Sequence, residues 1–276
     1  MTDPVSRSYA SALADGEPVL ALRGISKRFG AVQALTDVEL EVHQGEVVAL
    51  VGDNGAGKST LVKSIAGVHT IDDGQIEWEG RPVSVHRPQD AQHLGIATVY
   101  QDLALADNLD VVANLFLGRE LTTHGTLDEV AMEKRAQELL DTLSIRIPSV
   151  RIPVASLSGG QRQVVAIARS LIGDPKVVIL DEPTAALGVE QTAQVLDLVE
   201  RLRGRDLGVI LISHNMVDVA AVADTVAVLR LGRNNGTFPM AGTTQETIIA
   251  AITGATDNAV TRRAARATWP RPEGEA

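Results

Sequence analysis

A lysine and a hydroxyl residue follow a cluster of glycines in the way that a phosphate-binding loop requires. Gly52, Gly57, Lys58 and Ser59 fit the pattern G-x-x-x-x-G-K-[ST], directly behind the apolar run 47–51. Glycines let a backbone turn its N–H groups inward around a phosphate, and the helix that follows adds the positive end of its dipole. A glycine-rich turn without chemical purpose is the alternative. The order of strand, loop and helix favours a triphosphate site.

Each polar side chain of this loop has an expected role. Lys58 would neutralise β- and γ-phosphate oxygens, Ser59 would reach a magnesium ion, and Thr60 would reach an α-phosphate oxygen. The full set of residues predicted to bind the nucleotide in this loop is Gly52, Asn54, Gly55, Ala56, Gly57, Lys58, Ser59 and Thr60.

Two adjacent carboxylates stand at the end of another apolar strand. The segment 177–183 reads VVILDEP, which places Asp181 and Glu182 at the carboxyl edge of a sheet, where α/β proteins keep their ligands. Asp181 fits the magnesium-side acid that accompanies a phosphate loop, and Glu182 is then free to polarise an attacking water. The alternative is a helix cap with a solvated neighbour. The phosphate loop favours the catalytic interpretation.

A further cluster of glycines opens a helix in the segment 156–175. Ser158, Gly159 and Gly160 stand at its start, and Gly173 closes it. The unpaired N–H groups there make a second anion site, with the Ser158 hydroxyl as an extra donor. A serine N-cap with permissive glycines explains the same residues equally well. If both sites are real, the second is idle or serves another chain's nucleotide, because the chain has only one matching set of lysine, hydroxyl and acid.

Short β-like runs must position these residues. Alternating runs are typical of antiparallel strands with one buried face, and uniformly apolar runs are typical of strands covered on both faces. Two kinds of sheet are therefore implied, in an α/β protein. The runs lie at 19–22, 38–42, 47–51, 75–80, 96–100, 177–181, 209–213 and 225–231.

Helical periodicity is concentrated between about 86 and 172, and the part between the strands near 100 and 177 has no convincing β run. We predict a mainly helical insert there, with its clearest helix at 127–143. Another helix spans 189–203, with an apolar face of Val189, Ala193, Leu196, Val199 and Leu202. The predicted organisation is one nucleotide-binding domain at 18–254, with loose tails at 1–17 and 255–276.

Composition and charge exclude several classes of protein. The 276 residues contain no cysteine, so disulfides and cysteine-based metal sites are excluded. The net charge of -10, from 25 basic and 35 acidic residues, disfavours nucleic acid as a partner. No signal sequence is recognisable, and no apolar run approaches the roughly 20 residues that span a bilayer. We therefore expect a cytosolic protein, and any membrane role must come through a partner.

Four motifs together resemble the ATP-binding subunit of ABC transporters, over roughly residues 19–252. They are GDNGAGKST, LSGGQ, VVILDEPTAAL and the histidine of ILISH. The resemblance implies a P-loop NTPase core with a mostly parallel sheet, an antiparallel β subdomain and an inserted α-helical subdomain. It also implies ATP and Mg²⁺ as cofactors, and a head-to-tail dimer in which Lys58 of one chain and the LSGGQ residues of the other enclose one ATP. Those residues include Ser158, Gly159, Gly160 and Gln161.

The resemblance assigns three further residues. Gln101 in VYQDLAL resembles the Q-loop glutamine, which senses magnesium and the attacking water where the helical insert meets the membrane partner. His214 resembles the switch histidine that contacts the γ-phosphate, and Phe29 resembles the aromatic residue that stacks on adenine. Without the resemblance, Gln101 is a loop amide, His214 a structural histidine and Phe29 equally a core side chain.

One loop departs from the family pattern. Where the family usually reads S-A-L-D, this chain reads AALG at 185–188, so Gly188 replaces the aspartate that communicates across the dimer. Glycine cannot replace that hydrogen bond. Phosphate binding and Glu182 are untouched, so we expect activity to survive.

The AALG variant and the stretch 98–120 resemble ATP-binding subunits of bacterial monosaccharide importers. The implied function is ATP hydrolysis that powers import of a sugar. The implied partners are a second copy, integral membrane permease subunits and, indirectly, an extracytoplasmic solute-binding protein, with no nucleic acid, at the inner face of the cell membrane. The alternatives are transport of another solute, export, a soluble ATPase acting on ribosomes or DNA, and a regulatory module that holds ATP without splitting it.

Overall fold

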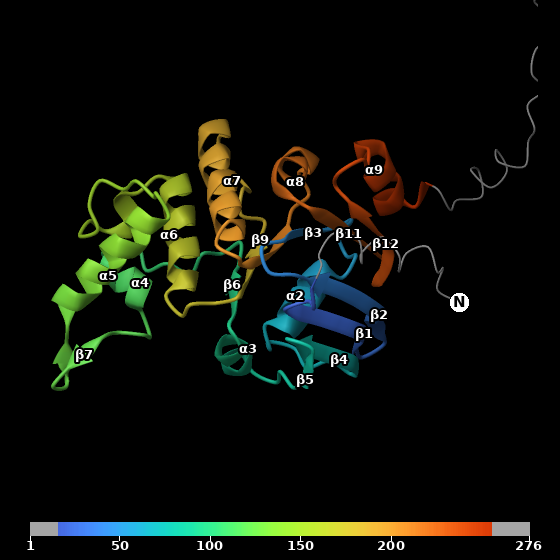
Figure 1. Ribbon diagram of the computed structural model, residues 1–276, viewed down its shortest axis with the longest axis horizontal. Coiled ribbons are helices and arrows are strands. Elements are labelled where there is room, and N and C mark those ends of the chain that lie inside the picture. The colour runs from blue at the N-terminus through green and yellow to red at the C-terminus, as the bar shows by residue number, and fades with distance from the viewer. Residues whose placement is uncertain (1–15, 256–276) are drawn as a thin grey trace, which may run out of the picture.

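The computed structural model describes residues 16–255, which form two large β-sheets with helices packed around them (Figure 1). A group of helices lies at one end of the molecule, and the two sheets extend toward the other end, with the smaller sheet below the larger one in this view (Figure 1). The predicted tails fall outside the described residues, except for 16, 17 and 255.

The larger sheet has six strands in the order β12-β11-β3-β10-β9-β6. Neighbouring strands pair in parallel, except that β12 runs antiparallel to β11. The strands are β3 (Val47–Val51), β6 (Ile96–Val99), β9 (Val177–Asp181), β10 (Gly208–Ile212), β11 (Thr225–Arg230) and β12 (Arg233–Pro239). The mostly parallel sheet is confirmed. The sequence did not predict β12, because its residues RNNGTFP are mainly polar and include Gly236 at a φ of 124°.

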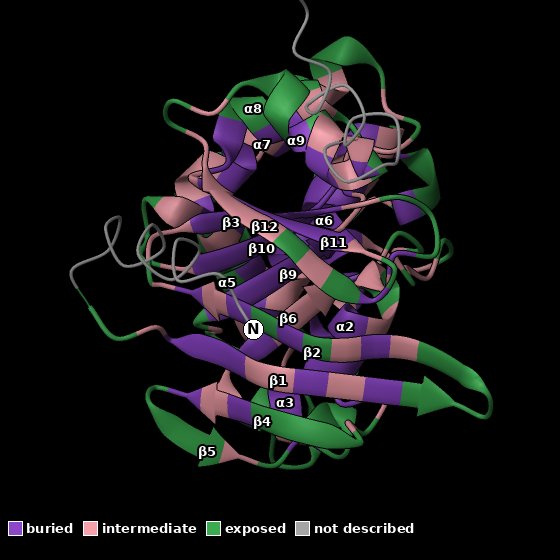
Figure 2. Cartoon of the chain, turned by 90° about the vertical axis from the view of Figure 1, so that its right-hand side faces the viewer, coloured by how far each residue is buried: buried purple, intermediate pink, exposed green. Residues whose placement is uncertain are grey.

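Alternate residues of these strands face two separate hydrophobic cores. Val47, Ala49 and Val51 of β3 belong to one core, and Val48 and Leu50 belong to the other. Successive side chains of a strand point to opposite faces, so a strand covered on both sides must be apolar at every position. All five residues of β3 are buried accordingly, and Figure 2 shows the same burial for the central strands.

The second sheet is antiparallel, with the order β2-β1-β4-β5. Its strands are β1 (Leu20–Phe29), β2 (Val32–Val42), β4 (Asp73–Trp78) and β5 (Arg81–Val83). β2 contains the alternating run that predicts an antiparallel strand, but β1 begins with a uniformly apolar run. Ala21 of β1 pairs with Glu41 and Glu77, and Arg23 bonds both carboxylates. These long side chains cover Ala21, so a small apolar residue is buried on the polar face.

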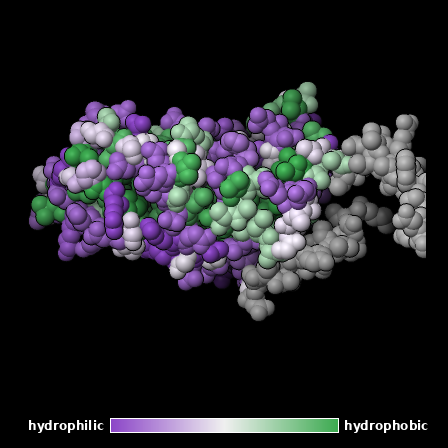
Figure 3. All heavy atoms as spheres, turned by 90° about the horizontal axis from the view of Figure 1, so that it is seen from above, coloured by the Kyte–Doolittle hydropathy of each residue, from purple (hydrophilic) through white to green (hydrophobic). Residues whose placement is uncertain are grey.

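Helices cover both faces of the larger sheet. The core that contains Val47 also includes residues of α6 (Gly159–Leu171), α7 (Val189–Arg203), α8 (Met216–Val222) and α9 (Gln245–Thr253). The core that contains Val48 includes residues of α2 (Lys58–Ile65), α3 (Pro88–Leu94) and the antiparallel sheet. The outer surface over α7, α8 and α9 carries hydrophobic groups scattered among hydrophilic ones (Figure 3).

The helix α7 has the predicted bounds, and the predicted face is buried at Val199 and Leu202 and partly buried at Leu196. Its buried residues are Val195, Leu198, Val199 and Leu202. Val189 is 92% exposed and Ala193 is also exposed. The prediction that these two residues lie on the buried face is therefore wrong, because the first turn of α7 does not lie against the core.

The range predicted as a helical insert, 86–172, also contains α3 and β6, and β6 is part of the larger sheet. The later helices in this range are α4 (Val111–Phe116), α5 (Glu129–Thr142), the short η1 (Val154–Ser156) and α6. A hairpin of β7 (Thr122–Thr123) and β8 (Thr126–Leu127) lies between α4 and α5. The expectation that this part has no β structure is wrong, because strands of two residues are too short to show alternation.

A buried amide fixes the loop that precedes α4. Asn114 is fully buried, and its Nδ2 lies 3.0–3.2 Å from the carbonyl oxygens of Ala106, Leu109 and Asp110. Its Oδ1 accepts a hydrogen bond from the Ala106 N–H at 2.7 Å. One side chain thus satisfies several backbone groups that a buried loop would leave unpaired.

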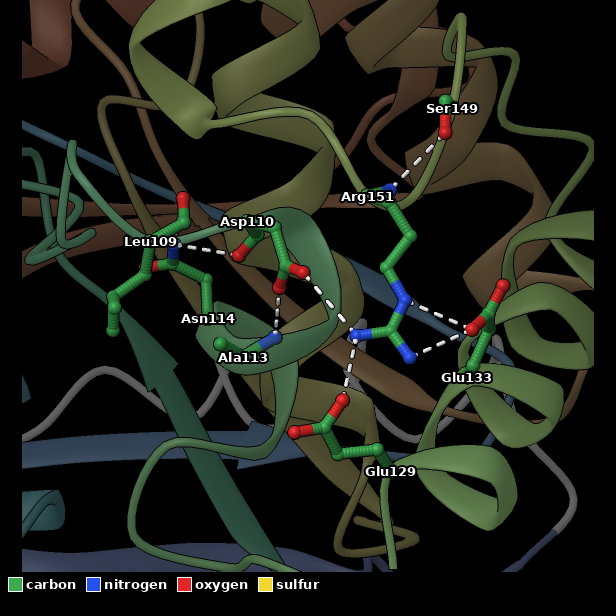
Figure 4. Close-up of polar contacts among 8 residues, drawn as sticks. All are labelled: Leu109, Asp110, Ala113, Asn114, Glu129, Glu133, Ser149 and Arg151. Carbon is green, nitrogen blue, oxygen red and sulfur yellow. Dashed lines mark hydrogen bonds and ion pairs between the residues drawn. The ribbon is translucent and has the colours of Figure 1, made fainter.

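A surface cation joins the same loop to α5 (Figure 4). The guanidinium of Arg151 lies 3.4 Å from Asp110, 3.5 Å from Glu129 and 2.7 Å from Glu133. These carboxylates belong to the residue before α4 and to the first turns of α5. Because the ion pairs are largely solvent-accessible, they contribute much less to stability than the buried Asn114.

Asn114→Leu is expected to lower the free energy of unfolding by about 3 kcal/mol, because buried backbone groups lose their partner. Arg151→Met should cost less than about 1 kcal/mol. Urea unfolding followed by circular dichroism measures both changes. Equal losses in the two variants would show that the amide network is not what holds this loop.

Candidate functional site

The loop after β3 is pressed so closely against its surroundings that two of its positions accept only glycine. Gly52, Gly55 and Gly57 have φ values of 153°, 80° and 106°. A Cβ at Gly52 would lie 2.2 Å from the carbonyl oxygen of Leu229, and a Cβ at Gly57 would lie 2.8 Å from Cδ2 of Leu35. Gly55 faces open space. The loop is therefore held between β11 and β2.

The first turn of α2 presents unpaired backbone donors beside this loop. Gly57 is the N-cap of α2 and has no side chain to satisfy them. The N–H groups of Lys58, Ser59 and Thr60 consequently have no partner within the helix. Such donors, at the positive end of a helix dipole, fit a phosphate group.

The other predicted loop residues differ in exposure. Asn54 and Ser59 are exposed and Thr60 is half-buried. Ala56 is buried, and its carbonyl oxygen accepts a hydrogen bond from the N–H of Gly232 at 3.0 Å. Ala56 therefore anchors the loop to the turn between β11 and β12, while Asn54 and Ser59 face outward.

The ammonium of Lys58 folds back over the loop. Its Nζ donates to the carbonyl oxygens of Gly52 at 2.6 Å and Asp53 at 3.1 Å. Burial lowers the pKa of Lys58 below its usual range, while the nearby carboxylates of Glu182, Asp53 and Asp181 act in the opposite direction. The cation thus lies between the loop and the acids that follow β9.

The parallel register brings the predicted residues to one edge of the larger sheet. The strands β3, β6, β9 and β10 all end there, with Ile212 of β10 paired to Leu50 of β3 and to Asp181 of β9. The loop 52–57 follows β3 at this edge. The predicted residues at the ends of the other three strands, or just beyond them, are Gln101, Asp181, Glu182 and His214.

Asp181, the last residue of β9, is half-buried beside these charges. Burial raises the pKa of Asp181, and the charge of Glu182 adds to that effect. Lys58 and Lys63 oppose it. A further cation beside Asp181, in addition to Lys58 and Lys63, would favour the ionised form of its carboxylate.

Glu182 is held in a strained backbone conformation and is bonded to His214. Its φ of 51° lies in the left-handed region, which is uncommon for a residue with a side chain. Its N–H donates to the carbonyl oxygen of Ile212 at 2.9 Å, and its Oε2 lies 2.8 Å from Nδ1 of His214. The sequence predicts a Glu182 that is free to face water, whereas here His214 occupies one of its oxygens. The His214 side chain is 75% exposed, so it can turn away without disturbing the core.

Ser158 caps α6 in a reciprocal arrangement with Gln161. Its Oγ accepts a hydrogen bond from the Gln161 N–H at 3.2 Å, and the Gln161 Oε1 accepts one from the Ser158 N–H at 3.0 Å. The N-cap that the sequence offered as an alternative is therefore present, and in this contact the Ser158 hydroxyl is an acceptor. α6 packs in the core that contains Val47 and α2 packs in the core that contains Val48, so the two helices lie on opposite faces of the larger sheet.

Gln101 lies exposed in the loop after β6. Arg169, which was not predicted from the sequence, holds the next part of this loop. The Arg169 guanidinium donates to the carbonyl oxygens of Leu103 and Ala104, both at 2.7 Å. Burial lowers the pKa of Arg169. A cation within the apolar stretch VVAIARSL of α6 is the signal that could have identified it.

Phe29 is 43% exposed at the end of β1, which excludes the alternative of a core side chain. Its ring meets that of His69 edge-on, with centroids 5.1 Å apart and an interplanar angle of 72°. The Nζ of Lys27 lies 5.5 Å from the Phe29 centroid. The ring is therefore positioned by its neighbours and accessible from solvent.

Comparison with known proteins places this geometry in a family. The model of the family described as "ABC transporter" matches residues 35–185, which include the loop after β3, the start of α6 and the acids after β9. The chain belongs to the ABC transporter family. The α/β class and the ABC cassette fold are therefore confirmed, with the parallel sheet, the antiparallel sheet and the helical segment as described above.

Curated relatives share much of the chain. A xylose/arabinose import ATP-binding protein of Sulfolobus acidocaldarius is 48% identical over 215 residues, covering 78% of this chain and 86% of that protein. A fructose import ATP-binding protein of Rhizobium meliloti is 45% identical over 247 residues, covering 87% and 95%.

A solved structure of an ATP-binding cassette of an ABC transporter, in its ADP conformation, matches with a TM-score of 0.73 at 25% identity. The match covers 90% of this chain and 98% of that one. Within residues 16–255, no helix combines the length and the apolar character that crossing a membrane requires.

Gly188, where the chain departs from the family pattern, lies next to a contact between α7 and α6. Gly188 is the N-cap of α7, and its N–H lies 3.4 Å from Oε1 of Gln191. A Cβ at Gly160 would lie 2.8 Å from Cβ of Gln191. The first turn of α7 is thus packed onto the first turn of α6 within one chain, although the aspartate usual at position 188 is missing.

Gly57→Ala is expected to reduce both the melting temperature and the ATP affinity, because the new Cβ meets Leu35 and the backbone has a positive φ. Gly55→Ala is the matched control, since its φ is also positive but its Cβ meets nothing within 4 Å. Thermal unfolding and calorimetric titration measure the two effects. If Gly55→Ala is as damaging as Gly57→Ala, close packing does not determine the shape of the loop.

Proposed function

We propose that this chain is the ATP-binding and ATP-hydrolysing subunit of an importer for a monosaccharide. The observation that carries the proposal is the edge of the larger sheet, where the glycine-containing loop 52–57 lies together with Lys58, Asp181 and Glu182. The relatives named as xylose/arabinose and fructose import ATP-binding proteins support a sugar as the transported solute.

The loop and α2 fit a triphosphate with Mg²⁺. The backbone N–H groups of the loop and of the first turn of α2 surround the phosphates, and Lys58 exchanges its carbonyl contacts for β- and γ-phosphate oxygens. Ser59 and Asp181 offer the oxygen ligands that Mg²⁺ prefers, together with phosphate oxygens, and Gln101 is a further candidate. When bound, Mg²⁺ neutralises the charge that develops on the phosphates.

Glu182 orients the attacking water and accepts its proton at a carboxylate oxygen. In the described conformation that carboxylate is bonded to Nδ1 of His214. We propose that His214 turns toward the γ-phosphate when ATP binds, which is possible because its side chain is exposed. This movement leaves Glu182 available to the water.

Two copies of the chain complete each site. Ser158, Gly159, Gly160 and Gln161 begin α6, which lies on the opposite face of the larger sheet from α2. In a head-to-tail pair, the start of α6 in one copy faces the triphosphate held by Lys58 of the other. A cassette of the same fold, 24% identical with a TM-score of 0.68, is described as a dimer bound to ADP and Pi. Phe29, exposed at the end of β1, stacks on the adenine.

The remaining partners follow from an importer. Two integral membrane permease subunits bind the cassettes at the inner face of the membrane, and an extracytoplasmic solute-binding protein delivers the sugar. ATP binding draws the two copies together, which drives the permeases to reorient, and hydrolysis releases the pair.

Glu182→Gln is expected to lower ATP turnover by about 10²–10⁴-fold, because the amide cannot accept a proton from water. ATP should still bind, so an ATP-bound dimer accumulates. Phosphate release and size-exclusion chromatography with ATP and Mg²⁺ measure the two effects. Turnover at the wild-type rate would remove Glu182 from the reaction.

Lys58→Ala serves as the control for this experiment. Loss of its charge-assisted hydrogen bonds should weaken ATP binding by about 10–100-fold. Neither the dimer nor phosphate release is then expected at ATP concentrations that saturate the wild type. Unchanged nucleotide affinity would contradict the proposed phosphate site.

A further inference from the structure

A buried carboxylate that the proposed reaction does not use lies directly beneath the catalytic edge. Asp218 in α8 is only 4% exposed. Its Oδ2 accepts a hydrogen bond from the Thr184 hydroxyl at 2.6 Å, and its Oδ1 accepts one from Nδ2 of Asn215 at 2.9 Å. Among residues 16–255, no cation forms an ion pair with it. Burying a carboxyl group costs free energy unless hydrogen bonds satisfy its oxygens, and Thr184 and Asn215 supply these bonds.

The two donors come from the two loops that carry the proposed catalytic pair. Thr184 lies two residues after Glu182, in a turn closed by the hydrogen bond from the Ala185 N–H to the Glu182 carbonyl oxygen at 3.1 Å. Asn215 follows His214 directly. Asp218 therefore ties the turn after β9 to the turn after β10.

Two further hydrogen bonds of Asn215 hold the turn that carries His214. The Asn215 N–H donates to Oγ of Ser213 at 3.0 Å, and its Oδ1 accepts from the Val217 N–H at 3.0 Å as the N-cap of α8. The amide of Asn215 thus has its oxygen on α8 and its nitrogen on Asp218. The position of the Asn215 side chain leaves little freedom to the adjoining backbone.

Glu182 needs such support because its backbone is strained. A non-glycine residue in the left-handed region is strained and persists only where its surroundings impose it. Its N–H bond to Ile212 fixes one side of the residue, and the Thr184–Asp218 bond fixes the turn on the other side.

We propose that Asp218 is a positioning residue, which holds the loops of Glu182 and His214 in register so that Glu182 keeps its strained conformation and reaches the attacking water. The inference rests on the proposed function of Glu182 and adds to it the residue that sets the geometry. Asp218 has no direct role in the proposed reaction, because it is buried and bonded to other side chains. It acts through Thr184 and Asn215.

The substitutions Asp218→Asn and Asp218→Ala differ in the hydrogen bonds that they keep. An asparagine at 218 can accept from Asn215 with its oxygen and donate to the Thr184 hydroxyl, which can act as acceptor. Asp218→Asn is therefore expected to keep turnover within about threefold of the wild type. Asp218→Ala loses both links, and displacement of a catalytic group by about 1 Å costs on the order of 10²-fold. We expect a loss of about 10–100-fold in turnover for that variant.

The test measures phosphate release at saturating ATP, and ATP affinity by calorimetry without magnesium, for the full-length chain. The expected result for Asp218→Ala is lower turnover at unchanged ATP affinity, because the phosphate loop and α2 do not depend on α8. Asp197→Ala is the matched control, since this aspartate is exposed on α7. Its turnover should equal that of the wild type.

Two variants keep the test decisive if Asp218→Ala does not fold. Thr184→Val removes one donor at nearly constant shape, and Thr184→Ser restores the hydroxyl. Turnover should fall in the first and recover in the second, with melting temperatures showing that both are folded. The proposal is overturned if Thr184→Val or folded Asp218→Ala turns over at the wild-type rate, if Asp218→Asn is as impaired as Asp218→Ala, or if ATP affinity falls in step with turnover. If only the role of Asp218 is wrong, Glu182→Gln is still inactive. If the proposed function of Glu182 is wrong, Glu182→Gln turns over ATP at the wild-type rate.

Discussion

The parallel register of β3, β6, β9 and β10 is the constraint on which the site depends. These strands run in one direction and pair as neighbours, so the loops that follow them open at one edge of the sheet. Their side chains alternate between two cores, so a slip of one residue would move a whole set of apolar side chains to the wrong core. Hydrophobic packing of the strands therefore brings Lys58, Asp181 and Glu182 to one edge, and polar contacts such as those of Asp218 then hold the loops at that edge.

The polar contacts of the molecule fall into two groups with different roles. Lys58 bonds carbonyl oxygens of its own loop, and His214 bonds Glu182, at an accessible edge where a ligand can replace these partners. Asn114 and Asp218 are buried; Asn114 bonds backbone groups of its own loop, and Asp218 bonds the side chains of Thr184 and Asn215, which join two loops of the site. Exchangeable contacts thus lie where the proposed chemistry occurs, and permanent contacts lie beneath it.

Local sequence patterns predicted the phosphate loop, the apolar strands of the larger sheet and the bounds of α7, because these depend on a few neighbouring residues. The predicted buried face of α7 was wrong at Val189 and Ala193, since periodicity does not tell which end of a helix reaches the core. The strands β7, β8 and β12 were missed because they are short or polar. The links made by Arg169 and Asp218 join segments far apart in the chain, so their partners are defined only by the fold.

The central claim is that the phosphates lie between Lys58 of one copy and Ser158 of another. A crystal structure of the chain carrying Glu182→Gln, grown with ATP and Mg²⁺, tests it most directly. The account predicts a two-fold pair in which each triphosphate contacts the Lys58 loop of one molecule and the start of α6 of its twin. ATP bound to the loop while Ser158 faces solvent in every assembly, including one with the permease, would contradict it.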